Sequence, residues 1–160
     1  MPRWLEHRIP PPVIDAAFVL LMWLIARALP QAQLWPRGAS VLVLGAALGV
    51  ALALAGGVIA LAGVVEFRRA RTTVNPLAPQ KASTLVTTGV FGITRNPMYL
   101  GMWLVLAGWG VWLGNAAAWV ALPLFVLTIN ALQIQPEERA LRERFGEAFT
   151  RYAARVRRWV

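Results

Sequence analysis

The chain has 160 residues, of which 58% are hydrophobic and only 14% are charged. It contains no cysteine and a single histidine, which excludes disulfides and thiolate chemistry and argues against a metal site. The net charge of +9 would suggest nucleic acid in a soluble protein, but the basic residues flank long apolar blocks. We therefore expect one membrane domain, residues 1–160, whose neighbours are lipid headgroups and not nucleic acid or metal.

The first two apolar blocks predict membrane-spanning helices. Residues 13–29 follow three prolines, which would stop a helix extending further back, and they are just long enough to cross a bilayer. No small-residue cleavage site follows them, so we expect no cleavable signal peptide. Residues 41–65 carry no charge and can cross with tilt. This block contains glycines whose expected role is tight helix packing and not function, namely Gly45, Gly49, Gly56 and Gly57.

Two further blocks, residues 97–113 and 116–134, predict a helical hairpin, because a Gly-Asn turn separates them. Asn130 and Gln133 are polar residues near the end of the returning helix. We expect them to face protein or a cavity and not lipid. The predicted fold is thus an all-α integral membrane protein with about four transmembrane helices.

The remaining segments are polar. Residues 66–98 are too charged to span and form a loop rich in proline and glycine. From residue 136 onward, apolar and basic residues alternate with a helical period, which predicts an amphipathic helix on the membrane surface or against the loop. Gly146 is expected to bend this helix. The apolar stripe comprises Leu141, Phe145, Phe149, Tyr152, Val156 and Trp159.

The distribution of Lys and Arg predicts the topology. With four spans, the amino-terminal tail, the central loop and the carboxyl-terminal segment share one side of the membrane and carry fourteen of the sixteen basic residues. By the positive-inside rule this side is cytoplasmic, so both termini should lie there, in a membrane that we expect to be a prokaryotic inner membrane.

Two polar motifs lie on this side and resemble a known family. Residues 85–101 read LVTTGVFGITRNPMYLG, and Glu137-Glu138 precede a Phe-Gly pair, further aromatic residues and a basic end. Both are similar to the signature of the isoprenylcysteine carboxyl methyltransferase and phospholipid methyltransferase superfamily of small integral membrane enzymes. The resemblance covers about residues 75–159, and it is much more specific for the superfamily than for the substrate.

The resemblance implies a site for S-adenosylmethionine, with S-adenosylhomocysteine as the product, built from about residues 75–100 and 133–159. Along the cofactor would lie Leu85, Val86, Thr87 and Gly89, one wall would hold Arg95, Asn96, Pro97 and Tyr99, and the opposite wall would hold Glu137 and Glu138. The candidate catalytic residues are Arg95, Asn96, Tyr99 and Glu138. The family often has histidine where this chain has Asn96, and asparagine cannot take a proton at neutral pH.

The chemistry of these residues suits the cofactor. Carboxylates at Glu137 or Glu138 would accept hydrogen bonds from ribose or ammonium groups, and Arg95 would hold the carboxylate. The aromatic face of Tyr99 would favour the sulfonium cation, and Gly89 allows a close backbone approach.

Each residue taken alone has a simpler interpretation. Two glutamates at a helix start are favoured by the helix dipole. Arg95 and Tyr99 are typical interfacial anchors, and Asn96 with a following proline is typical of a helix cap. Their ordered occurrence together favours a methyltransferase site.

We expect direct methyl transfer to a lipophilic acceptor that enters from the bilayer. A carboxylate or thiolate acceptor is favoured because it needs no general base, although an amine remains possible. The alternatives are a small non-enzymatic four-helix protein, such as a transporter or an assembly subunit, and a membrane lipid or sterol reductase. No ionisable residue lies in the central part of a predicted span, which counts against a proton-coupled transporter, and no feature specifically demands a nicotinamide.

Overall fold

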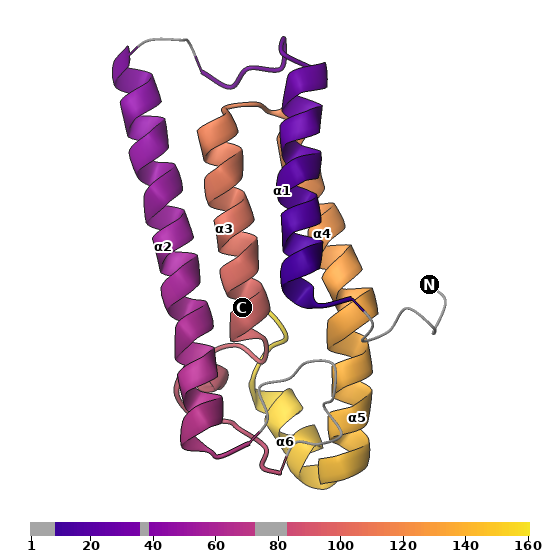
Figure 1. Ribbon diagram of the computed structural model, residues 1–160. Helices are drawn as coiled ribbons and strands as arrows, with labels where there is room; N and C mark the ends of the chain where they lie inside the picture. The colour runs from indigo at the N-terminus through magenta and orange to yellow at the C-terminus, as the bar shows by residue number, and fades with distance from the viewer. Residues whose placement is uncertain (1–8, 36–38, 73–82) are drawn as a thin grey trace.

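The computed structural model describes residues 9–35, 39–72 and 83–160, and these residues form helices and no β-strand (Figure 1). The predicted all-α membrane fold is confirmed. The helices are α1 (Pro11–Ala28), α2 (Ala39–Arg69), α3 (Pro97–Leu113), α4 (Ala121–Ile129), α5 (Gln135–Phe145) and α6 (Glu147–Arg155), and the short helical turns are η3 (Gly89–Gly92), η4 (Ala117–Val120) and the π-helical η5 (Asn130–Ile134).

Three segments of the described chain are long and apolar enough to cross a bilayer, Pro11–Ala28, Leu42–Arg69 and Ala117–Phe145. The shorter apolar helix α3 lies between α2 and the returning α4 as the fourth member of the bundle (Figure 1). The predicted hairpin between α3 and α4 is present. Gly114 ends α3 in the left-handed conformation, with φ of 59°, which glycine adopts without steric cost.

The returning helix is longer than its apolar stretch. It continues from Ala117 through η4, α4 and η5 into α5 without interruption, although its apolar part ends at Ile134. The π-helical turn ends at Ile134, two residues before Pro136, which cannot donate a backbone hydrogen bond and would crowd the preceding turn of a regular helix. The amphipathic segment is therefore not one separate helix. It is divided at Gly146, the expected bend, which has φ of 52°.

Helices α2 and α3 touch through their backbones. A Cβ atom added at Gly49 would lie 2.8 Å from the carbonyl oxygen of Gly108, and one added at Gly56 would lie even closer to that of Gly101. The two glycines on each helix are seven residues apart, so they lie on one face. The predicted tight packing is therefore present at Gly49 and Gly56, whereas a Cβ atom at Gly57 would meet nothing within 4 Å.

The buried core lies between α1, α3 and the returning helix. Phe18 and Phe125 pack edge to face with ring centroids 5.4 Å apart, and Met22 and Leu106 are fully buried. The outer face of α2 instead exposes apolar side chains such as Leu44 and Val58. A helix that is apolar on all sides is stable when lipid covers the face that protein does not cover.

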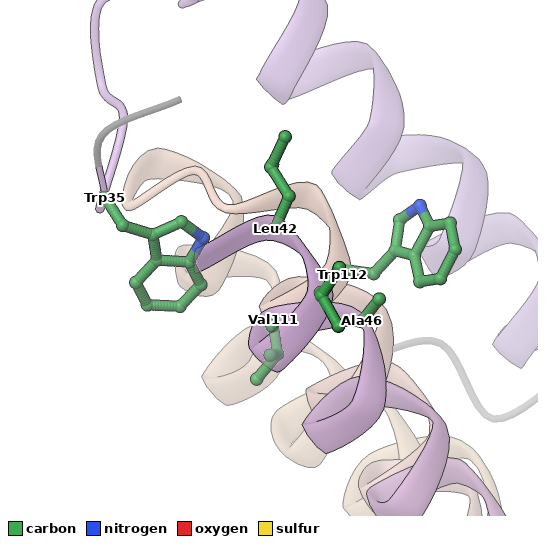
Figure 2. A pocket seen from close by; sticks show the side chains of 7 residues that line it. Trp35, Leu42, Ala46, Val111 and Trp112 are labelled. Atoms are coloured by element: carbon green, nitrogen blue, oxygen red, sulfur yellow. The ribbon is translucent and has the colours of Figure 1, made fainter. Parts of the chain in front are cut away.

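A pocket lies at the end of the bundle where α1 leads into α2 and α3 ends. Trp35 and Trp112 flank it, and Leu42, Ala46 and Val111 lie between them (Figure 2). Its lining is mostly apolar, and the polar motifs lie at the opposite end of the bundle (Figure 1).

Candidate functional site

The polar motifs converge at the end of the bundle where α2 ends, α3 begins, the returning helix continues as α5 and α6 folds back (Figure 1). One predicted wall lies at the start of α3 and the opposite wall lies on α5, both at this end of the bundle. Pro97 is buried at the first position of α3, as its fixed φ favours, and Glu137 and Glu138 lie in the first turn of α5.

Glu138 is held by two arginines. Its Oε1 accepts a hydrogen bond from Nη2 of Arg95 at 2.8 Å, and its Oε2 accepts one from Nη2 of Arg158 at 2.6 Å. Nε of Arg158 also donates to Oε1, at 3.1 Å. The side chains of Arg95 and Glu138 are each only 13% exposed, so water screens this pair weakly. The hydrogen bonds to Glu138 raise the pKa of Arg158 further above its usual range, which keeps that group charged.

Residues 94–96 also bind the carboxyl-terminal segment through its backbone. Nη1 of Arg95 donates to the carbonyl oxygens of Ala153, at 3.0 Å, and Val156, at 2.5 Å. These oxygens are available because α6 ends at Arg155 and the chain becomes extended. Nδ2 of Asn96 donates to the carbonyl oxygen of Arg158 at 2.8 Å. The start of α3 is thus fastened to residues more than fifty positions later in the chain.

Asn96 does not act through its side chain as a helix cap. It occupies the N-cap position of α3, but its side chain makes no capping hydrogen bond and reaches the carboxyl-terminal segment instead. The interpretation of Asn96 as a simple cap is therefore wrong for the side chain, although the first-turn role of Pro97 holds.

Tyr99 and Glu137 join the two predicted walls. The hydroxyl of Tyr99, a residue that is only 3% exposed, donates to Oε1 of Glu137. The backbone of Ile134 and Gln135 is helical, and the amide of Gln135 is bonded to the carbonyl of Asn130. Because the helix is continuous there, Glu137 and Glu138 do not lie at an open helix N-terminus. The helix dipole therefore does not explain the acidic pair.

The glycine-containing loop is held by the end of α2. Oε2 of Glu66 accepts a hydrogen bond from the hydroxyl of Thr88 at 2.7 Å, and a Cβ atom at Gly89 would lie 2.7 Å from Cδ of Glu66. Gly89 also has φ of 57°, a left-handed backbone conformation that glycine adopts without steric cost. The hydroxyl of Tyr152 donates to the carbonyl of Phe91 at 2.7 Å, which docks α6 on the loop. Burial raises the pKa of Tyr152 to about 12, although the charge of Arg95 opposes the rise, so this hydroxyl keeps its proton.

The structure thus brings together four of the predicted residues as two pairs, Arg95 with Glu138 and Tyr99 with Glu137. In the loop, Val86 is buried and Leu85 and Thr87 are half-buried, whereas the contacts at Gly89 are with Glu66. Sequence reasoning missed Glu66 and Arg158. The one sequence signal for Arg158 was the basic carboxyl-terminal end, and this signal does not distinguish Arg158 from the other arginines there.

Comparison with known proteins matches this region to a family. The model of the phospholipid methyltransferase family matches residues 44–148, which is about two thirds of the chain. The match includes most of α2, the loop, α3, the returning helix and the acidic pair.

Curated relatives agree with this match. Protein-S-isoprenylcysteine O-methyltransferase B of Arabidopsis thaliana is 29% identical over 108 residues, which cover 68% of this chain and 55% of that protein. A probable protein-S-isoprenylcysteine O-methyltransferase of Oryza sativa subsp. indica is 31% identical over 109 residues, 68% of this chain and 57% of that protein. The chain therefore spans about half the length of these two relatives.

A shorter relative is an uncharacterized protein of Haemophilus influenzae, 46% identical over 63 residues that cover 39% of this chain and all of that protein. No solved structure shows a significant match. The family match and the joined motifs lead to one conclusion, that the chain belongs to the phospholipid methyltransferase family.

Proposed function

We propose that the chain is an S-adenosylmethionine-dependent methyltransferase that modifies a lipophilic acceptor at the membrane interface. The observation that carries this proposal is the direct contact between the two family motifs, since Tyr99 bonds Glu137 and Arg95 bonds Glu138 across about forty residues of sequence. Both pairs lie at the end of the apolar bundle, where a soluble cofactor and a membrane-dissolved acceptor can meet.

The residues present fit the cofactor, with different roles for the two glutamates. Both oxygens of Glu138 already accept hydrogen bonds from arginines, and Arg95 already donates to Glu138 and to two carbonyls. We therefore infer that Arg95, Glu138 and Asn96 position the carboxyl-terminal segment. Tyr99 and Glu137 are left to contact the cofactor. A carboxylate at Glu137 suits the ammonium or the ribose hydroxyls.

The cofactor, when bound, supplies an electrophilic methyl group on a sulfonium. The chain would contribute orientation and exclusion of water, for which the burial of Tyr99 and Val86 is suited. A carboxylate or thiolate acceptor would need no general base, and this suits a site in which Glu138 is already bound by two arginines and Glu137 by Tyr99. The plant relatives are named as O-methyltransferases, which supports an oxygen acceptor.

We further propose that the site faces the cytoplasm. The carboxyl-terminal end of α2, the start of α3 and α6 share one end of the bundle, and fourteen of the sixteen basic residues belong to segments assigned to that side. A prokaryotic inner membrane is the location that we propose.

Binding of S-adenosylhomocysteine to the detergent-solubilised protein tests this function. Isothermal titration should show one site, and Glu137→Gln should weaken binding about tenfold or more, as expected for loss of a charge-assisted hydrogen bond. Glu143→Gln, an exposed residue on the same helix, is the matched control and should bind like the wild type. A folded wild type that does not bind S-adenosylhomocysteine would refute the proposal and leave the transporter, subunit and reductase alternatives.

A further inference from the structure

Gln133 is a buried polar residue that no part of the proposed site uses. It is 0% exposed and lies in the π-helical turn, within the apolar part of the returning helix. Its Nε2 donates to the carbonyl of Ile9 at 2.7 Å, so the orientation of the amide is set. Its Oε1 is buried and has no hydrogen-bond donor among the described residues.

A buried oxygen without a donor is costly, and the cost is greater where lipid replaces water. A second acceptor oxygen, Oδ1 of Asp15, is also buried and has no donor within the described part of the chain; it lies about one turn into α1 and close in sequence to the Ile9 contact. The amide oxygen of Gln133 can only accept a hydrogen bond, and the same holds for the carboxylate oxygen of Asp15 when Asp15 is ionised. A group that satisfied both oxygens would therefore have to supply donors.

Gln133 lies on the bilayer side of the proposed site, from which the methyl acceptor would arrive. It precedes Glu137 by four residues, which puts both side chains on one face of the helix, with Gln133 about 6 Å deeper toward the bilayer. Its neighbours Leu132 and Ile134 belong to the same buried core cluster as Tyr99. A lipophilic molecule arriving from the membrane would therefore reach the level of Gln133 before that of Glu137.

We propose that Gln133 is a specificity residue whose amide oxygen accepts a hydrogen bond from an N–H or O–H group next to the methylated atom of the acceptor. This inference rests on the proposed methyltransferase function. It narrows the acceptor from any lipophilic nucleophile to one that carries a hydrogen-bond donor beside the reacting group. A site built around such a bond discriminates strongly against analogues that lack the donor, because they would leave Oε1 buried and unpaired.

The test uses pairs of acceptors of which only one member carries a hydrogen-bond donor beside the carboxylate. For an N–H donor the pair is N-acetyl-S-farnesylcysteine and S-farnesylthiopropionate, and for an O–H donor it is 2-hydroxypalmitate and palmitate. Transfer of radiolabelled methyl from S-adenosylmethionine is measured with the full-length protein in detergent. The wild type should prefer the donor-bearing member of one pair by about tenfold or more in kcat/KM, and the preferred pair identifies the donor.

Variants separate recognition from stability. Gln133→Met keeps the volume of the side chain and should abolish the preference, while its affinity for S-adenosylhomocysteine stays within about twofold of the wild type. Gln135→Met, at an exposed position on the same helix, should keep the preference. If Gln133→Met lowers activity equally on both members of a pair, or loses cofactor affinity, Gln133 is a structural or cofactor residue and the inference is wrong.

Methylation of neither pair by a wild type that binds S-adenosylhomocysteine would also refute the inference, because the acceptor would then lie outside the proposed class. A wild type that binds no S-adenosylhomocysteine would instead refute the proposed function itself, so the two failures are distinguishable.

Discussion

Removal of the Glu138 carboxylate should destabilise the site far more than removal of any exposed glutamate. Glu138 separates two guanidinium groups, and its side chain is 13% exposed. In Glu138→Gln the two cations would face each other across a neutral amide that cannot accept both sets of hydrogen bonds. Breaking a buried ion pair by removing one partner costs about 3–5 kcal/mol. Because the side chain of Arg158 is 35% exposed and can turn toward water, we expect a smaller loss, about 2–3 kcal/mol.

The assay is thermal unfolding in detergent micelles, together with titration of S-adenosylhomocysteine. For a chain of this size, about 2–3 kcal/mol corresponds to a fall of roughly 4–12 °C in Tm. Cofactor binding should weaken as well, because the carboxyl-terminal segment loses its anchor. Glu143→Gln, at an exposed position, should change Tm by less than about 2 °C.

A double-mutant cycle identifies the cause. Arg158→Gln should be destabilising by itself, but much less so when Glu138 is already Gln, because the interaction is then absent. Equal and small effects of Glu138→Gln and Glu143→Gln, or additive effects in the cycle, would refute the role assigned to this ion pair.

Other predictions concern the helix contact, the loop and the joined walls. Gly56→Ala should lower the stability by about 1–3 kcal/mol because its Cβ would press on the α3 backbone, whereas Gly57→Ala should be neutral or stabilising; thermal unfolding of both variants checks this, and similar Tm values would contradict it. Gly89→Ala should cost about 1–2 kcal/mol from the left-handed backbone alone and weaken S-adenosylhomocysteine binding several-fold in titrations, and unchanged affinity would show that the loop does not contribute. Tyr99→Phe should lose about 1–2 kcal/mol of stability because Glu137 is left without its donor, measured by the same melting assay; an unchanged Tm would mean that the hydrogen bond contributes nothing net.

Much of the fold follows from local sequence. Long apolar blocks predict spans because only a helix satisfies its own backbone hydrogen bonds in lipid, and the Gly-Asn turn predicts the hairpin because Gly114 can adopt a positive φ. The bend at Gly146 follows for the same reason. The continuation of the returning helix past Pro136 was not predicted, because a proline usually marks a helix start and the π-helical turn that accommodates it has no simple sequence pattern.

The candidate site, like the fold, was predicted only in part from local sequence. The two motifs could be found from the residues themselves, since their order and chemistry lie in short stretches of the chain. Their partners could not: Arg158 pairs with Glu138, and Glu66 bonds Thr88 across 22 residues. Seven arginines follow Glu138 in the sequence, and nothing local distinguishes the one that returns to it. Hydrophobicity and turn chemistry act over a few residues and determined the helices and motifs, whereas the pairing of charges depended on how the packed helices brought distant segments together.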